Sequence, residues 1–188
     1  DPGLSIPSDI EAIPRPIIGF IGFIAFHIDL YLLNYVAETC PGWSIVLIGP
    51  NNLKSGGLHA KLQGRANVFF FGKRELDALP GYLKAIDVAI MPYDKTTHMM
   101  HSYPLKLHEY LAAGKPVVAV SLPELLPFQN VVYMADSLAS FVQCIEQALH
   151  ENSNERIQQR VAVGRANTWE QRVGEMSRLI SSKLGMAV

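Results

Sequence analysis

Short runs of apolar residues alternate along the chain with longer stretches in which apolar positions recur every three or four residues. A short apolar run bounded by turn residues is typical of a strand buried on both faces, whereas a period of 3.6 residues is typical of an amphipathic helix. We expect strands at 17–22, 44–48, 67–71, 86–91 and 117–120, and a short edge strand at 131–134. Strands that alternate with helices predict an α/β fold, here a Rossmann-like open parallel sheet of about six strands with helices on both faces.

Helices are predicted at 28–39, 76–85, 105–113, 137–150, 155–166 and 169–184. Ser137 and Asp29 stand where the first N–H groups of a helix need an acceptor. Gly114 stands just after a helix, where a left-handed residue is favoured. Pro80 interrupts the second of these helices, and the stretch 51–65 is interpreted as a loop with at most one helical piece.

The first sixteen residues differ from the rest because they are rich in proline, with Pro2, Pro7, Pro14 and Pro16. Such a segment is typical of an interdomain linker. The chain begins at Asp1 rather than at a methionine, so we expect a fragment in which the linker 1–16 follows a preceding domain. Residues 17–188 fit one further domain that is long enough to bury a core.

Composition argues against several classes of protein. The formal net charge is −1 and charged residues make up 18%, which does not indicate a nucleic-acid surface. No apolar run reaches the roughly 18 residues of a membrane-spanning helix, and no signal peptide is evident. Cys40 and Cys144 match no metal-ligand spacing and are interpreted as buried, reduced thiols, which favours a cytoplasmic protein. His98 and His101 have no cysteine or carboxylate cluster beside them, so we expect no metal site.

A polar loop, 92–104, connects the fourth predicted strand to the helix 105–113. An open α/β sheet binds its ligand at the carboxyl ends of strands, and the N–H groups and dipole of a following helix favour an anion. Ser102 and the N–H of Tyr103 could donate to phosphate oxygens. The alternative is a surface loop without a ligand, which the length of the loop disfavours.

The segment P-L-K-L-H-E-Y-L-A-A-G-K-P-V-V, from Pro104 to Val118, closely resembles the nucleotide-sugar-binding signature of GT-B glycosyltransferases, particularly those of group 1. The resemblance extends from Ile17 to Trp169. It implies the second, donor-binding half of a two-domain enzyme that transfers a hexosyl group from a UDP- or GDP-type sugar to an acceptor. The nucleotide sugar is then a substrate rather than a cofactor, and the acceptor-binding domain would precede this chain. The full-length protein could be peripheral to a membrane.

The same resemblance implies roles for residues of the signature. The glutamate that matches Glu109 holds the ribose hydroxyls of the nucleotide, and the backbone amides that match Tyr103 to Leu105 approach its diphosphate. The family often carries a second glutamate eight residues earlier, where this chain has His101, which would lie near the hexose. Lys106 is expected to pair with the diphosphate, with an ordinary position on the helix surface as the alternative.

Residues at the ends of other predicted strands extend the candidate site. Lys73 and Arg74 follow Gly72 and could border the nucleotide, or they could be a solvated pair that flanks a helix start. Gly22 ends the first strand, but the full G-x-G-x-x-G fingerprint is absent, so close helix–sheet packing is an equal alternative. Ser121, after the fifth long strand, could contact the donor.

Two further functions remain open. One is a Rossmann-like interaction module that has lost catalysis, with His101 as the mark of that loss. The other is half of a nucleotide-sugar epimerase, because those enzymes share the GT-B fold. No catalytic base can be named from this chain, since the resemblance places the acceptor on the other domain.

Overall fold

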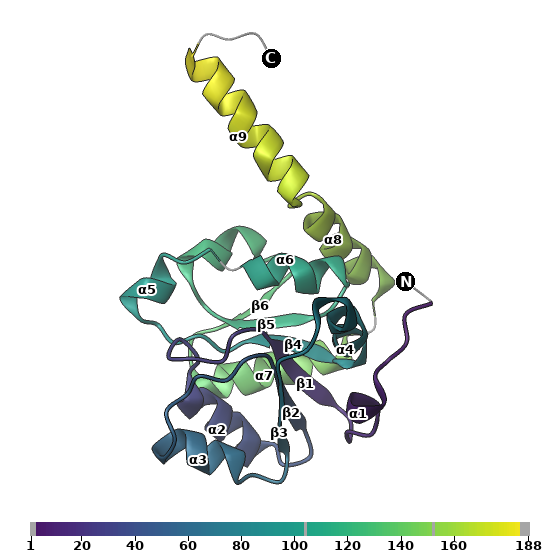
Figure 1. The fold of residues 1–188 in the computed structure, drawn as a ribbon, viewed down its shortest axis with the longest axis vertical. Coiled ribbons are helices and arrows are strands. Elements are labelled where there is room, and N and C mark those ends of the chain that lie inside the picture. The colour runs from purple at the N-terminus through teal and green to yellow at the C-terminus, as the bar shows by residue number, and fades with distance from the viewer. Residues whose placement is uncertain (1–2, 104, 152, 185–188) are drawn as a thin grey trace.

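The computed structural model describes residues 3–103, 105–151 and 153–184, and within these ranges the strands form one parallel six-stranded sheet (Figure 1). The strands are β1 (Ile17–Ile21), β2 (Ser44–Ile48), β3 (Val68–Gly72), β4 (Val88–Met91), β5 (Val117–Val120) and β6 (Tyr133–Ala135). They lie in the order β3-β2-β1-β4-β5-β6, which is the order of a Rossmann fold. The predicted fold is therefore confirmed.

The centre of the sheet is buried on both faces. Every residue of β1, β2, β4 and β5 is buried, whereas the edge strands β3 and β6 are partly exposed. In the register of the sheet, Ile17 lies opposite Ser44 and Ile18 opposite Val88. Burial on both faces explains why these strands appear in the sequence as continuous apolar runs rather than as an alternating pattern.

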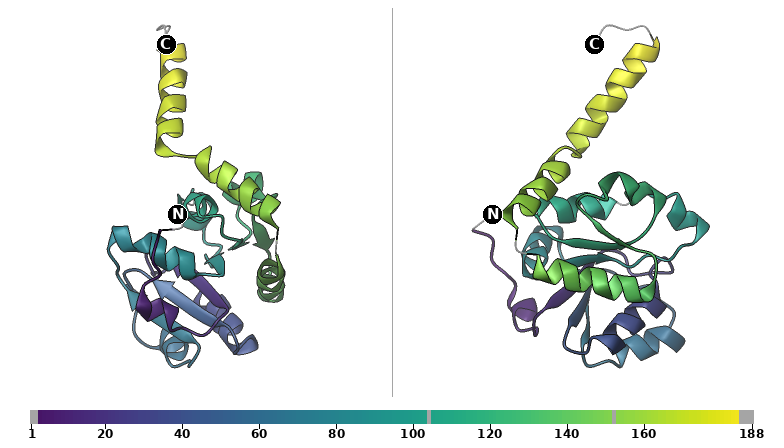
Figure 2. Two further views of the ribbon diagram at one scale, coloured as in Figure 1. Left: turned by 90° about the vertical axis from the view of Figure 1, so that its right-hand side faces the viewer. Right: turned by 180° about the vertical axis from the view of Figure 1, so that it is seen from behind.

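Helices cover both faces of the sheet (Figure 1 and Figure 2). On one face lie α2 (Leu30–Thr39), α3 (Gly57–Gln63) and α7 (Leu138–His150), and on the other lie α4 (Leu79–Ala85) and α6 (Leu105–Ala112). α8 (Asn154–Arg165) packs on α6, and α9 (Trp169–Leu184) leads away from the sheet with none of its residues buried. Shorter pieces are α1 (Ser8–Glu11), α5 (Thr97–Met100) and the 3-10 turns η1 (Leu76–Ala78) and η2 (Pro123–Phe128).

The helix ends use the caps that the sequence predicts. The Asp29 carboxylate accepts from the Leu32 N–H at 2.9 Å, and the Ser137 hydroxyl accepts from the Ser140 N–H at 3.1 Å. Gly114 has a φ of 71°, and its N–H donates to the Leu111 carbonyl at 2.9 Å. These local contacts stop α6 and start α2 and α7 without help from distant residues.

The helix predicted at 76–85 is divided into η1 and α4. Pro80 lies in the first turn of α4, where a missing N–H costs no intrahelical hydrogen bond. Gly81 follows it, and an added Cβ there would lie 2.6 Å from the Ser5 carbonyl oxygen. The glycine therefore allows the N-terminal segment to pass directly over α4.

Residues 3–16 pack against the domain. Ile10 is fully buried, and Asp9 accepts hydrogen bonds at 2.9 Å from both Arg74 and the Tyr82 hydroxyl. The segment predicted as a linker is thus held by apolar burial and by charge. Its connection to a preceding domain stays a prediction.

The chain leaves the neighbouring strands β1 and β4 toward opposite faces, because β1 leads to α2 and β4 leads to α6. This is the topological switch point of the sheet. Open α/β sheets form a crevice there, at the carboxyl ends of the strands, and bind ligands in it.

Candidate functional site

The two loops that follow β1 and β4 are joined to each other by backbone hydrogen bonds. The Asp29 N–H donates to the Pro92 carbonyl at 2.8 Å, and the Asp94 N–H donates to the His27 carbonyl at 3.0 Å. His27 also lies against Tyr93, with 5.7 Å between ring centroids. The start of the long polar loop is therefore held against the first loop of the domain.

The hydroxyl of Tyr110 fixes α6 over the end of β1. It accepts from the Ile21 N–H at 2.8 Å and donates to the Ile21 carbonyl at 3.2 Å. Burial raises the pKa of this phenol, so the hydroxyl keeps the proton that it donates. Tyr110 is predicted from the sequence as a core residue, and the structure adds the hydrogen bonds by which it anchors α6.

Glu109 and Lys106 lie together on the exposed side of α6. The Lys106 ammonium is 3.1 Å from the Glu109 carboxylate, and both side chains are partly exposed. Burial, and to a smaller extent the Glu109 charge, raise the pKa of nearby Tyr93 to about 12. The charge of Glu109 thus acts on a residue that follows β4.

A cavity of about 440 Å³ separates α6 from η1 and α4, and Glu109 and Lys106 line one side of it. The opposite wall is apolar and consists of Leu76, Leu79, Pro80 and Leu83. A pocket with one apolar wall and a few polar groups is the usual form of a small-molecule site.

The first amide of α6 is hydrogen-bonded to the loop that precedes the helix. The Leu105 N–H donates to the Tyr103 carbonyl at 3.1 Å, so this amide already has an acceptor. The Leu105 side chain is half exposed, His101 is exposed and Ser102 is partly buried. The sequence predicts that the amides of Tyr103 to Leu105 contact the diphosphate. To do so, the Leu105 N–H would have to exchange the Tyr103 carbonyl for a phosphate oxygen.

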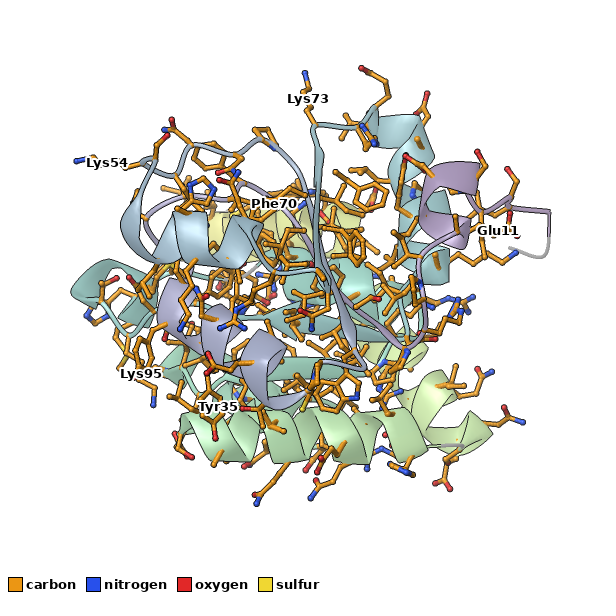
Figure 3. The ribbon with its side chains drawn as sticks, turned by 90° about the horizontal axis from the view of Figure 1, so that it is seen from below. Glu11, Tyr35, Lys54, Phe70, Lys73 and Lys95 are labelled. Carbon is orange, nitrogen blue, oxygen red and sulfur yellow. The ribbon has the colours of Figure 1, made fainter. Side chains whose placement is uncertain are left out.

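The two cations after β3 have different surroundings. Arg74 donates to the Tyr82 hydroxyl at 2.8 Å and to Asp9 at 2.9 Å, and it lies 5.5 Å from the centroid of the Phe71 ring. Its charge is therefore used to hold the N-terminal segment. Lys73 is exposed and points away from the body of the domain (Figure 3).

Gly22 and Ser121 both stand at the carboxyl edge of the sheet, with their amides engaged in it. The Gly22 N–H donates to the Ile48 carbonyl at 2.8 Å, and the Ser121 N–H donates to the Ala135 carbonyl at 2.9 Å. A Cβ on residue 22 would lie 2.8 Å from the ring of Phe20. The glycine therefore leaves room for a ring of the preceding strand, β1.

Two residues that contact the predicted site were not predicted from the sequence. Arg172, from α9, and His108, from α6, both contact the hydroxyl of Tyr103. The signal for His108 was an ionisable residue on a helix face that is otherwise apolar. Arg172 gave no local signal, because 69 residues separate it from Tyr103.

The described part of the chain contains no group of three or more His, Cys, Asp or Glu side chains arranged to hold a metal ion. No helix within it has the length and apolar character needed to cross a bilayer. The side chain of His98 lies outside the described residues.

Comparison with known proteins gives matches at the levels of sequence and fold. A family model described as "Glycosyl transferases group 1" matches residues 15–151. The putative teichuronic acid biosynthesis glycosyltransferase TuaH of Bacillus subtilis (strain 168) is 32% identical over 158 residues, which cover 81% of this chain and 40% of that protein. The chain thus spans about two fifths of this curated relative.

Solved structures share the fold at low identity. The α,α-trehalose 6-phosphate synthase of Burkholderia multivorans aligns with a TM-score of 0.69 and 14% identity over 94% of this chain and 45% of its own. The C-terminal domain of a glycosyl transferase group 1 family protein (LpcC) from Francisella tularensis aligns with a TM-score of 0.59 and 14% identity, over 86% of this chain and 91% of that domain.

Proposed function

The chain belongs to the group 1 glycosyltransferases, and on that basis we propose that it is the part of such an enzyme that binds the sugar donor. The donor would be a UDP- or GDP-type sugar, from which a hexosyl group passes to an acceptor. The leaving group is then a nucleoside diphosphate, and the main task of this domain is to hold it and to neutralise its charge.

The observation that carries the proposal is the position of Glu109 beside the cavity between α6 and α4. A carboxylate can accept two hydrogen bonds from a vicinal diol, which suits the ribose of a nucleotide. The apolar wall across the cavity could cover the nucleoside. Glu109 is therefore proposed to hold the ribose.

The ion pair between Glu109 and Lys106 does not argue against this role. Both side chains are partly exposed, and such exposed pairs contribute only about 0–1 kcal/mol. A donor could therefore separate the two side chains at little cost. Lys106 would then be free to neutralise the diphosphate near the start of α6.

Other residues have smaller proposed roles. The loop with Ser102 and Tyr103 would lie along the diphosphate, and His101 would lie near the hexose. Lys73 could approach the nucleotide, whereas Arg74 would first have to leave Asp9. Gly22 and Ser121 would border the donor only through close approach of the backbone. No residue is assigned as the catalytic base, and the acceptor is proposed to bind a preceding domain.

Calorimetric titration of the chain with UDP, GDP and ADP tests the proposal. Glu109→Gln should weaken binding of the preferred nucleotide by about 1–3 kcal/mol, because hydrogen bonds to a charged acceptor are lost. The matched control is Glu146→Gln, an exposed glutamate on α7 at the opposite face of the sheet, which should leave the affinity unchanged.

Two outcomes would reject the proposal. The first is that no nucleotide binds at millimolar concentration. The second is nucleotide binding that does not change in Glu109→Gln, which would remove ribose recognition from this site. Either result would favour an interaction module without catalysis.

A further inference from the structure

Three side chains from three parts of the chain meet beside the start of α6. They are Tyr103 from the loop, His108 from α6 and Arg172 from α9. Arg172 donates a hydrogen bond to the Tyr103 hydroxyl oxygen, and its guanidinium carbon lies 4.4 Å from the centroid of the Tyr103 ring. The Tyr103 ring is stacked on the ring of His108, with 5.5 Å between centroids and 17° between planes.

The hydroxyl of Tyr103 has a hydrogen-bond partner on two other elements, α6 and α9. The Tyr103 oxygen accepts from Arg172, and the same hydroxyl shares a hydrogen bond with Nε2 of His108. Burial raises the pKa of the Tyr103 phenol, which keeps the proton on the hydroxyl. Burial, and then the charge of Arg172, lower the pKa of His108, which favours the neutral imidazole.

The cluster is not the arrangement that would best stabilise the fold. Nδ1 of His108 and Nε of Arg172 are both buried without a hydrogen-bond partner, and each such unpaired polar atom reduces stability. His108 is 8% exposed and lies between Tyr103 and Phe128, whose ring centroid is 5.3 Å away. A phenylalanine at position 108 could occupy this aromatic site without an unpaired polar atom, so stability alone does not explain the histidine.

Arg172 is also unusual within α9. The large apolar residues of this helix are exposed, among them Val173 at 55% and Met176 at 52%. Arg172 is more buried than these neighbours and accounts for the polar contact of α9 with the loop before α6. It also donates to the Asn167 side chain at 3.1 Å, which ties it to the turn between α8 and α9.

We propose that Arg172 and His108 are positioning residues that hold the Tyr103 hydroxyl and thereby fix the loop 101–103 at the start of α6. This inference rests on the proposed function, because the loop matters for activity only if the donor diphosphate lies against it. It means that the placement of α9 controls the geometry of the donor site, although α9 contributes no residue to the cavity beside Lys106.

A double-mutant cycle on nucleotide affinity tests whether Arg172 acts through Tyr103. UDP and GDP are titrated into the full chain and into Tyr103→Phe, Arg172→Met and the double variant. Each single change should weaken binding on the order of tenfold, as misplacement of binding groups does. The double variant should be no weaker than either single variant, because both changes remove the same hydrogen bond.

Matched variants separate positioning from general damage to the fold. Arg172→Lys keeps a donor for the hydroxyl and should recover part of the affinity. Arg178→Met, at an exposed position on α9 whose side chain donates to the Gly174 carbonyl at 3.3 Å, should bind like the wild type. His108→Phe should leave the midpoint of thermal unfolding unchanged or raise it, and yet it should weaken nucleotide binding.

Several results would overturn the inference. The first is that the losses of nucleotide affinity in the double-mutant cycle add up. The second is that Arg172→Met binds nucleotide like the wild type. The third is that His108→Phe loses thermal stability in proportion to its loss of nucleotide affinity. If the wild type binds nucleotide and Glu109→Gln weakens it, these results reject only the positioning role. If the wild type binds no nucleotide, the proposed function fails and the positioning role fails with it.

Discussion

A single buried hydroxyl decides where the main candidate residue lies. Tyr110 bonds to both backbone groups of Ile21, and this fixes the rotation of α6 about its axis. Because Glu109 precedes Tyr110 in the same turn, its carboxylate is directed to the cavity side rather than into the core. A residue that was predicted only as core thus sets the geometry of a residue that was predicted as functional.

Gly49 is a second residue on which the site depends. Its φ is 138°, and an added Cβ would lie 1.9 Å from the carbonyl oxygen of Gly22. Gly49→Ala should therefore destabilise the protein by about 3 kcal/mol or more, through backbone strain and overpacking. Urea unfolding followed by circular dichroism measures the effect.

Gly42→Ala is the control for that change, because a Cβ on residue 42 meets nothing within 4 Å and its φ is not left-handed. It should change the free energy of unfolding by less than about 1 kcal/mol. If the two substitutions change the free energy of unfolding equally, the close approach of Gly49 to the Gly22 carbonyl does not contribute to stability.

At the scale of elements, α6 is held between the sheet and α8. The two helices approach closely at Gly164, where an added Cβ would lie 2.6 Å from the backbone nitrogen of Ala112. This contact is between two backbones, so no side chain can move aside to relieve it. The position of α8 is thus coupled to that of the helix that carries Glu109.

Gly164→Ala should separate α8 from α6 and destabilise the protein by about 1–3 kcal/mol. The matched substitution is Gly174→Ala in α9, where a Cβ meets nothing within 4 Å. That change should leave the helix content unchanged or raise it, because alanine favours helix by about 1 kcal/mol over glycine. Chemical denaturation and far-ultraviolet circular dichroism distinguish the two, and an unchanged unfolding midpoint for Gly164→Ala would contradict the close packing.

At the scale of the whole molecule, the N-terminal segment is part of the folded domain. Ile10 contributes a fully buried side chain to the core, although the proline-rich sequence around it is typical of a linker. The pairing of Asp9 with Arg74 adds a contact over 65 residues of sequence. Any domain that precedes this chain would therefore connect through a segment that is already anchored.

Ile10→Ala should destabilise the whole domain by about 2–5 kcal/mol, because it leaves a cavity in a core that cannot fully relax. Glu11→Ala, at an exposed position in the same short helix (Figure 3), should have little effect. A thermal melt of both variants gives the comparison. If Ile10→Ala melts like the wild type, the segment is only loosely attached.

Much of the fold could be predicted because it depends on neighbours in sequence. The strands appear as apolar runs, and Asp29, Ser137 and Gly114 mark helix ends by bonding within a few residues. The signature around Glu109 was likewise contiguous, so the family followed from the sequence. The division of 76–85 into η1 and α4 was harder to predict from the sequence, because the effect of Pro80 depends on where the helix begins.

The sequence by itself determined the alternation of strands and helices, the helix caps and the segment that carries Glu109, because each of these is set by side chains close together in the chain. Only the tertiary structure decided that Arg74 holds Asp9, that the wall of η1 and α4 faces Glu109, and that Arg172 reaches Tyr103. Those contacts join residues far apart in the chain. They depend on how whole elements pack, and no local pattern of residue types encodes that packing.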